Sequence, residues 1–500
     1  MRKWIALLLC LPMLLGCGQG WAESTQKAPD YIMEGYDGDS ANHVWETNLF
    51  FARMQEKTGI SFQFNQSTDY SAWTGRKAAI ANGEELPDVL FKAALTMEEI
   101  RDLYASGIII DLRPYLETYA PNLWGLLQSR EDWMAAVTLE DGSIPALPNF
   151  NELQNNNVMW INTEWLDRLK LEKPTTAEEL TEVLRQFKTG DPNRNGKADE
   201  IPLSFIGMWD LRFLAHAFGI IDNDYYVRVR DGQVTSSLTS EENRAFLTWL
   251  HQLWEENLLD HHGFNTADSL RQITDAKAAI PYGMFLSPSP LTVVPSAALS
   301  LYETLEPLTW KGERIYRDLT GTVIRGTFAL TNVCKEPEKL VQWVDFLYTE
   351  EGSRLAQIGQ EGEDYIWDEE GYWEWNADME TVANYILSGS TISEGGTAPG
   401  WTSVDLQRKY ADTVTRTNIE QLYDYRQYML LPYPPVILSA ADQARIAELQ
   451  LPLGKYAENA MAMFVTGDTE MTDENWQAFT EKIRSLGLDE MITIWQKYIH

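Results

Sequence analysis

Apolar and polar positions follow two different periods along the first part of the chain. Residues 31–36 form a short apolar-rich run, and a helical spacing of apolar residues over 45–54 stops at Gly59. Alternation over 60–64 and the run 87–91 predict two further strands with a helix between them. Strands that alternate with helices in this way predict a mainly parallel sheet.

The pattern breaks at a polar stretch and then begins again. Residues 149–157 are rich in Asn, which favours neither helix nor strand, so we expect the chain to cross there into a second lobe. Beyond it, 158–161 reads as a strand and Thr163 opens a helix. Thr176 with Glu179 forms a capping box for a helix through Phe187.

A later strand-like run, 324–331, and the helix after Pro337 predict a return to the first lobe. The Gly- and Ser-rich stretch 388–400 predicts a loop or a second crossing that delivers Trp401 at its end. The predicted organisation is 30–149 with 320–387 for lobe one, and 150–319 with 388–500 for lobe two.

The length of the chain agrees with two lobes, and its charge argues against nucleic acid as a partner. A chain of 500 residues exceeds what one core usually spans, and 44% hydrophobic residues suffice for substantial cores. The balance of 40 Lys and Arg against 74 Asp and Glu gives a net charge of -34. A surface of that sign repels phosphate backbones, so we expect no nucleic-acid partner.

The N-terminus has the features of an export signal. Basic Arg2 and Lys3 precede an apolar run, 4–15, that is too short to span a bilayer as a helix. Leu14-Leu15-Gly16-Cys17 resembles a bacterial lipobox, which implies a signal peptide over 1–16 and a lipid on Cys17. The alternative is an ordinary secretory peptide with an incidental cysteine. Residues 17–29 then predict a flexible tether to the membrane.

One internal segment has the composition of a cation loop. From Asp191 onward, oxygen-bearing side chains occupy alternate positions and Gly196 stands where a wrapping chain must turn sharply. The bidentate Glu of an EF-hand is missing, because its place is taken by Pro202, so the helix–loop–helix geometry is not implied. A solvated polar turn is the alternative. The predicted ligands of a structural calcium ion are Asp191, Asn193, Asn195, Lys197, Asp199 and Glu200.

Most sequence signatures of catalysis are missing, and carboxylates are too numerous to single out an acid/base pair, whereas aromatic residues are abundant. The sequence contains no His-Glu-x-x-His, no Gly-x-Ser-x-Gly and no Gly-x-Gly-x-x-Gly after a strand. Indole faces stack on sugar rings and carboxylates accept from hydroxyls, so we nominate residues at strand ends, helix starts and loops, with core packing as the alternative for each. The nominated ligand-binding residues are Tyr36, Asp37, Trp45, Trp73, Trp209, Tyr282, Trp310 and Trp401.

Several segments together resemble the family-1 extracellular solute-binding proteins of carbohydrate ABC importers. They are Trp160 to Leu169, Lys173 to Leu180, Gly83 to Val89, Asp141 to Pro148, and Lys277 to Ile280 with Gly283. The loop at 191–200 is similar to the calcium loop of the large oligosaccharide- and alginate-binding members. The resemblance covers nearly all of the mature chain. It implies a periplasmic-binding-protein-like α/β fold with two lobes, a hinge and an interlobe cleft.

The same resemblance implies a function without chemistry. A lipid-anchored, monomeric receptor on the outer face of the cytoplasmic membrane would capture a sugar or oligosaccharide by hinge closure and deliver it to ABC permease subunits. Arg212 and Arg325 could serve an anionic ligand, but overall acidity favours a neutral saccharide. The alternatives are a surface glycan-degrading hydrolase or lyase and a calcium-stabilised adhesin or sensor.

Overall fold

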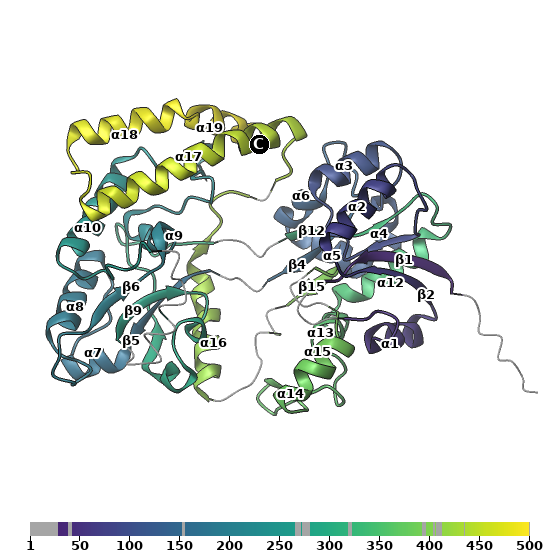
Figure 1. The fold of residues 1–500 in the computed structure, drawn as a ribbon, viewed down its shortest axis with the longest axis horizontal. Helices are drawn as coiled ribbons and strands as arrows, with labels where there is room; N and C mark the ends of the chain where they lie inside the picture. Colours follow the sequence, from purple (N-terminus) through teal and green to yellow (C-terminus); the bar gives the residue numbers. More distant parts are fainter. Residues whose placement is uncertain are drawn as a thin grey trace, which may run out of the picture.

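A computed structural model of the chain shows two α/β lobes side by side (Figure 1). It describes residues 29–38, 43–152, 156–265, 272, 281–318, 323–392, 397–403, 406, 413–434 and 436–499. The predicted signal peptide, Cys17, nearly all of the predicted tether and the segment Lys277 to Ile280 lie outside these residues. Among the described residues, no helix is both long and apolar enough to cross a membrane.

The first lobe is built on a six-stranded mixed sheet with the order β15-β4-β12-β3-β1-β2. β1 pairs in parallel with both β2 and β3, and β15 pairs in parallel with β4, whereas β12 runs antiparallel to β3 and β4. Its strands are β1 (Tyr31–Tyr36), β2 (Phe62–Ser67), β3 (Val89–Phe91), β4 (Leu147–Asn151), β12 (Val323–Leu330) and β15 (Gly400–Thr402).

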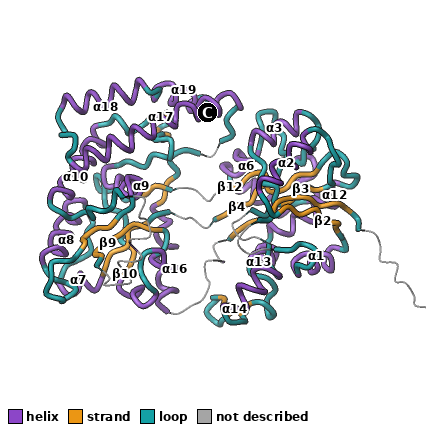
Figure 2. The backbone as a smooth tube through the Cα atoms, viewed as in Figure 1, coloured by secondary structure: helices purple, strands orange, loops and turns teal. Residues whose placement is uncertain are grey.

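Helices cover both faces of this sheet (Figure 2). The segment after α13 adds a two-stranded hairpin of β13 and β14 and a π-helical turn over Val382–Ile386. The remaining elements are α1 (Leu49–Thr58), α2 (Tyr70–Ala81), α3 (Met97–Ala105), α4 (Arg113–Tyr119), α5 (Pro121–Ser129), α6 (Glu131–Val137), α12 (Pro337–Asp345), α13 (Glu350–Gln357), β13 (Tyr365–Trp367), β14 (Trp373–Trp375), α14 (Met379–Thr381) and α15 (Leu387–Gly389).

Local sequence signals explain where these elements begin and end. Asn48 accepts a hydrogen bond from the Phe50 N–H and so caps α1, which Gly59 ends in the left-handed conformation with φ of 72°. Thr96 and Glu99 form a reciprocal capping box at the start of α3. The starts of α1 and α3 follow the carboxyl ends of β1 and β3, where α/β folds present their ligand sites, whereas Gly59 precedes β2 at the opposite edge.

The second lobe has a smaller, mostly antiparallel sheet with the order β10-β5-β9-β6, in which only β6 and β9 of the described strands run parallel. Its main elements are β5 (Val158–Asn162), α7 (Thr163–Leu169), α8 (Ala177–Thr189), β6 (Ile201–Ser204), α9 (Gly207–Leu211), the 3₁₀ helix Arg212–Phe218, β7 (Arg228–Arg230), β8 (Gln233–Thr235), α10 (Glu241–Glu255), β9 (Tyr282–Ser287) and β10 (Tyr302–Thr304).

The C-terminal part of the second lobe is mostly helical. It contains β11 (Tyr316–Arg317), α16 (Thr413–Tyr425), β16 (Met429–Leu430), α17 (Ala440–Thr466), α18 (Asp473–Ser485) and α19 (Leu488–Gln496). α17 packs against α10, and the buried side chains of α17, α18 and α19 join the same core as the second sheet. The first lobe has a separate core around Phe91, Trp343 and Leu347.

Two sequence-based expectations about the sheets differ from the structure. Residues 400–402, which we expected in lobe two, form an edge strand of the first sheet through hydrogen bonds to β4. The sequence could not reveal this, because a three-residue strand has no readable period. The sheets are also less parallel than the helix–strand alternation predicts, since β12 enters the first sheet from the other direction.

Candidate functional site

The chain passes between the lobes in three connections. The first joins β4 to β5, the second β11 to β12 and the third β15 to α16. The Asn156 amide donates to the Arg317 carbonyl oxygen at 2.8 Å, and the Glu152 N–H donates to the Thr402 carbonyl oxygen at 2.9 Å. The first connection is therefore hydrogen-bonded to residues next to the other two, as in a hinge.

Beside this hinge lies a cavity of about 330 Å³ to which both lobes contribute. We call it the interlobe cavity. The first lobe supplies Met97 from α3 and Arg325 from β12. The second supplies the rest of the wall, which includes Asn223, Asp224, Tyr225, Arg317, Asp318, Leu431, Pro432, Tyr433, Pro434, Val436, Ile437, Leu438, Gln443 and Trp495. Two larger hollows, of about 610 and 570 Å³, are lined by first-lobe residues alone and lie away from the hinge.

Side chains connect the lobes on either side of the gap between them. Arg101 of α3 donates to the carbonyl oxygen of Leu438 and to the side chain of Gln443. The Tyr372 hydroxyl of the β13–β14 hairpin donates to Glu420 of α16 at 2.7 Å. α3 and α17 lie at one end of the gap and α14 and α16 at the other (Figure 1). The described conformation is therefore one in which both ends are bridged.

Trp209 is the nominated tryptophan that the structure leaves most open, with 38% of its surface exposed. It lies on α9 of the second lobe, where its ring packs edge-on against Phe213. The Arg317 guanidinium lies 5.2 Å from the ring centre and that of Arg212 lies 5.9 Å away. An exposed indole beside the cavity-lining Arg317 suits the stacking of a sugar ring.

Asp210 follows Trp209 and connects α9 to the hinge. Its carboxylate accepts from the Ile206 N–H at 2.7 Å and from the Asn157 amide at 2.6 Å. Burial raises the pKa of Asp210 to about 7, and these two hydrogen bonds lower it only in part. Asn157 belongs to the first connection, so the protonation of Asp210 bears on how α9 is held against the hinge.

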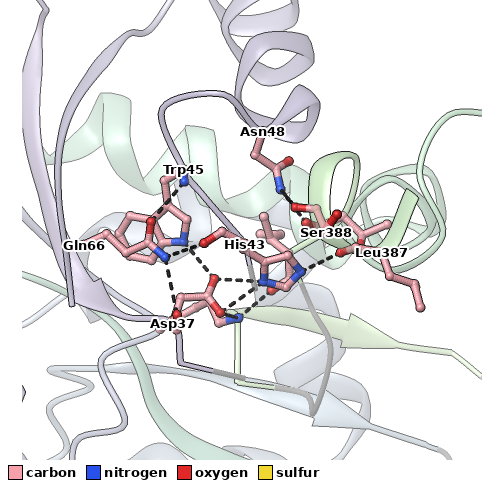
Figure 3. A network of polar contacts seen from close by, with 10 residues as sticks. Asp37, His43, Trp45, Asn48, Gln66, Leu387 and Ser388 are labelled. Atoms are coloured by element: carbon pink, nitrogen blue, oxygen red, sulfur yellow. Dashed lines mark hydrogen bonds and ion pairs between the residues drawn. The ribbon is translucent and has the colours of Figure 1, made fainter. Parts of the chain in front are cut away.

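Asp37 lies at the carboxyl end of β1 in a buried polar network (Figure 3). It accepts from the Lys92 ammonium at 2.7 Å, from His43 at 3.1 Å and from the Trp45 indole at 2.8 Å. Burial raises the pKa of Asp37, but the hydrogen bond from His43 and the charges of Lys92 and His43 outweigh it and bring the pKa to about 2. Neither Asp37 nor Lys92 exposes any side-chain surface.

The same network ties a distant segment to the first sheet. Lys92 also donates to the Ile392 carbonyl oxygen at 2.8 Å, and the other ring nitrogen of His43 faces the Leu387 carbonyl oxygen at 2.8 Å. The Asn48 amide donates to the carbonyl oxygens of Ser388 and Thr391. These contacts cover the carboxyl edge of the strands with residues 387–392.

The structure therefore assigns several nominated ligand residues to other roles. Trp45, Trp73 and Tyr282 are fully buried in the cores, and the Trp73 indole donates to the Ala93 carbonyl oxygen. Asp37 is enclosed by its network. In this conformation none of the four side chains is exposed to a ligand, because each is enclosed by other residues of its lobe.

The other nominated residues are more accessible but are not brought together. Tyr36 is half-buried and packs edge-on against Tyr70 at 5.4 Å. Trp310 is half-buried beside Phe218 in the second lobe, and Trp401 is half-buried against the first core. None of the nominated residues is among those that line the interlobe cavity.

The cavity wall contains residues that the sequence did not indicate. Arg317, Tyr225, Tyr433 and Trp495 belong to a two-residue strand, to loops and to the last helix, so they share no pattern in the sequence. The one usable signal is the Pro-rich run that begins at Pro432, which marks an irregular segment between helices.

The predicted cation loop connects α8 to β6 and curls on itself. Asp191 accepts from the N–H groups of Asn195 and Gly196, and the Asn193 and Asn195 amides donate to Asp199. Asp191 and Gly196 have positive φ values of 47° and 71°. Within the described part of the chain, no three His, Cys, Asp or Glu side chains are placed to hold one metal ion.

One observation in this loop nevertheless fits a cation. Both carboxylate oxygens of Glu200 are buried and have no hydrogen-bond partner among the described residues. Burial, followed by the charges of Asp199 and Asp191, raises the pKa of Glu200. A carboxylate held without partners beside two others is the arrangement that a bound Ca²⁺ would relieve.

Two α/β lobes, three hinge connections and an interlobe cavity define a protein of the periplasmic-binding-protein type, which confirms the predicted fold class. No family model matches the chain. The fructooligosaccharide ABC transporter substrate-binding protein FusA of Streptococcus pneumoniae is 27% identical to it over 537 residues, which cover 99% of this chain and 96% of FusA. Lipoprotein LipO of Bacillus subtilis is 26% identical over 268 residues, which cover 52% of this chain and 51% of LipO.

Solved structures show the same architecture. An HMO-binding solute-binding protein associated with an ABC transporter of Bifidobacterium longum infantis superposes with a TM-score of 0.73 at 21% identity, over 94% of this chain and 98% of its own. FusA in complex with kestose superposes with a TM-score of 0.67 at 23% identity, over 93% of this chain and 98% of FusA. FusA has also been solved as an EF-hand mutant. These homologues and neighbours include ABC-transporter substrate-binding proteins for oligosaccharides, which agrees with the family resemblance read from the sequence.

Proposed function

We propose that this protein is the substrate-binding component of an ABC importer and that it captures a sugar or oligosaccharide between its lobes without chemical change. The observation that carries the proposal is the cavity at the hinge, to which Arg325 of one lobe and Arg317 of the other both contribute. A ligand that contacts both walls binds the closed arrangement better than the open one and so drives closure. The end-to-end similarity to FusA supports a saccharide as that ligand.

The test is calorimetric titration of the purified protein with a panel of oligosaccharides that includes kestose, together with chromatography of each sugar after long incubation. We expect at least one sugar to bind and every sugar to elute unchanged. Release of shorter products would show a glycan-degrading enzyme instead. A panel in which nothing binds would contradict the proposed function.

We further propose that the loop between α8 and β6 binds a structural calcium ion. The residues that would hold it are the carboxylates Asp191, Asp199 and Glu200, with oxygens of Asn193, Asn195 and Lys197. The unpartnered Glu200 carboxylate supports this assignment. The ion would neutralise the loop's negative charge and fix the end of α8 against β6; it would take no part in ligand capture.

We also propose that the protein is anchored to the membrane by a lipid, as its N-terminal sequence predicts. Cleavage before Cys17 and attachment of lipid to its thiol would hold the protein on the outer face of the cytoplasmic membrane, where it meets the permease subunits of its importer. The similarity to a lipoprotein of Bacillus subtilis supports this anchor. Metabolic labelling with a radioactive fatty acid tests it, because Cys17→Ser should abolish the label.

A further inference from the structure

Arginines gather around the interlobe cavity of a protein that is otherwise strongly acidic. Arg317 and Arg325 line the cavity. Arg101 donates to Leu438 and Gln443, and Arg212 donates to the Asn223 carbonyl oxygen, so both hold residues of the wall. The aspartates of the wall are Asp224 and Asp318. A third aspartate, Asp222, lies behind the wall with Arg212 and Arg317. These four arginines therefore outnumber three aspartates, in a chain whose net charge is -34.

Arg317 is a buried cation with incomplete compensation. Its residue is 4% exposed, and one nitrogen donates to Asp224. Its Nε and Nη1 atoms are buried and have no hydrogen-bond partner among the described residues. The side chain of Asp224 is 61% exposed, so water weakens the attraction between the two charges. Burial, followed by the nearby charge of Arg212, lowers the pKa of Arg317, and the charges of Asp224 and Asp222 offset this only in part.

Arg325 presents a second guanidinium from the opposite lobe. Its Nε donates to the Ala136 carbonyl oxygen at 2.6 Å, which holds the side chain beside α6. Within the described chain, its terminal nitrogens donate to no other residue. An anion placed between Arg317 and Arg325 would therefore bridge the lobes through charge-assisted hydrogen bonds.

We infer that the interlobe cavity is a subsite for a carboxylate, so that the saccharide is an acidic one that carries uronic- or sialic-type acid groups, with Arg317 and Arg325 as the residues that hold the acid. This inference rests on the proposed function and adds the charge class of the ligand. A hydroxyl would satisfy a donor but would leave the positive charge uncompensated, whereas a carboxylate does both. The partly exposed Trp209 ring lies beside Arg317, whose guanidinium is 5.2 Å from the ring centre.

The test compares acidic oligosaccharides with their own carboxyl-reduced forms by calorimetry. The probes are tri- and tetrasaccharides of galacturonic, glucuronic and mannuronic acid and sialylated trisaccharides, each beside its reduced counterpart. For the saccharide that binds, we expect the acidic form to bind at least about tenfold more tightly and to weaken as salt is added. Arg317→Gln should remove most of this preference and Arg325→Gln part of it. Arg185→Gln, which changes a partly exposed ion pair with Glu256 on the second lobe, is the matched control.

Other results of these titrations would overturn the acid preference, the assignment of the subsite or the proposed function. Equal binding of an acidic saccharide and its reduced form, or preference for the reduced form, overturns the inference and leaves the receptor function standing. An acid preference that both arginine variants retain overturns the assignment of the subsite. If Arg317→Gln fails to fold in a thermal melt, Arg325→Gln on its own must lower the preference. If wild type binds neither these sugars nor the kestose-containing neutral panel, the proposed function itself fails.

Discussion

Replacing Asp37 with Asn removes one charge from the buried network of the first lobe and leaves the shape of the side chain almost unchanged. The Lys92 ammonium, which has no exposed surface, then lacks its carboxylate. The variant should fold less stably, because a buried cation without its partner costs more than the same cation in water. Glu117→Gln is the matched control, since it removes a negative charge from an exposed position on α4.

The structure sets the size of the effect. The network brings the pKa of Asp37 from 3.8 to about 2, and this difference corresponds to about 2.4 kcal/mol in favour of the ionised form in the folded protein. Breaking a buried pair by removing one partner typically costs about 3–5 kcal/mol. We therefore expect Asp37→Asn to lower the free energy of unfolding at pH 7 by about 2–5 kcal/mol, and the control to change it by less than about 0.5 kcal/mol.

The pH dependence provides a second, sharper readout. Because the folded pKa of Asp37 lies below its unfolded value, its stabilisation is complete above about pH 4 and is lost as the pH falls toward about 2. The difference between wild type and Asp37→Asn should shrink over that interval. Urea denaturation followed by tryptophan fluorescence, with hydrogen exchange of β1 and β3 to locate the change, measures it. The reasoning would be refuted if the variant were as stable as wild type at pH 7, or if the difference in their free energies of unfolding did not change with pH.

Three further outcomes follow from the second lobe. Burial raises the pKa of Asp210 to about 7, so the stability that its protonated form gives is lost as the pH rises from about 4 past 7. Asp210→Asn should therefore raise the free energy of unfolding by up to about 4 kcal/mol at pH 8 and by much less at pH 4. An equal effect at the two pH values would contradict this. Trp209→Ala should weaken saccharide binding roughly 10- to 100-fold by calorimetry, with Trp310→Ala close to wild type. A calcium chelator should lower the melting temperature of wild type but not of Asp199→Asn, and identical wild-type melts would remove the calcium assignment.

Features encoded locally were predictable from the sequence. Gly59 ends α1 because it adopts the left-handed conformation, and Thr176 caps α8 by accepting from the Glu179 N–H. The predicted capping box is only half formed, because the Glu179 carboxylate accepts from Thr175 and not from the Thr176 N–H. The change from one lobe to the other falls within the predicted stretch 149–157, but residues 149–151 still belong to strand β4, because pairing with β12 and β15 overrides their weak strand preference. The helix after Pro337 and the core position of Trp343 follow in the same way from a clear apolar face.

Features that depend on distant partners were not predictable. Asp37 follows a strand as a ligand-binding carboxylate would, but Lys92 and the carbonyl groups of residues 387–392 reach it from elsewhere in the chain and enclose it. The cavity wall joins Arg317 of a two-residue strand to Arg325 of the other lobe. Sequence spacing carries no information about such a meeting, because the hinge and the packing of the lobes decide it.

Native mass spectrometry of the purified protein mixed with the saccharide panel tests the central claim most directly. The account predicts a complex whose mass is that of the protein plus one whole saccharide, and the same saccharide mass when the ligand is released hours later. Sugar fragments in the released fraction, or free protein at every saccharide concentration, would contradict it.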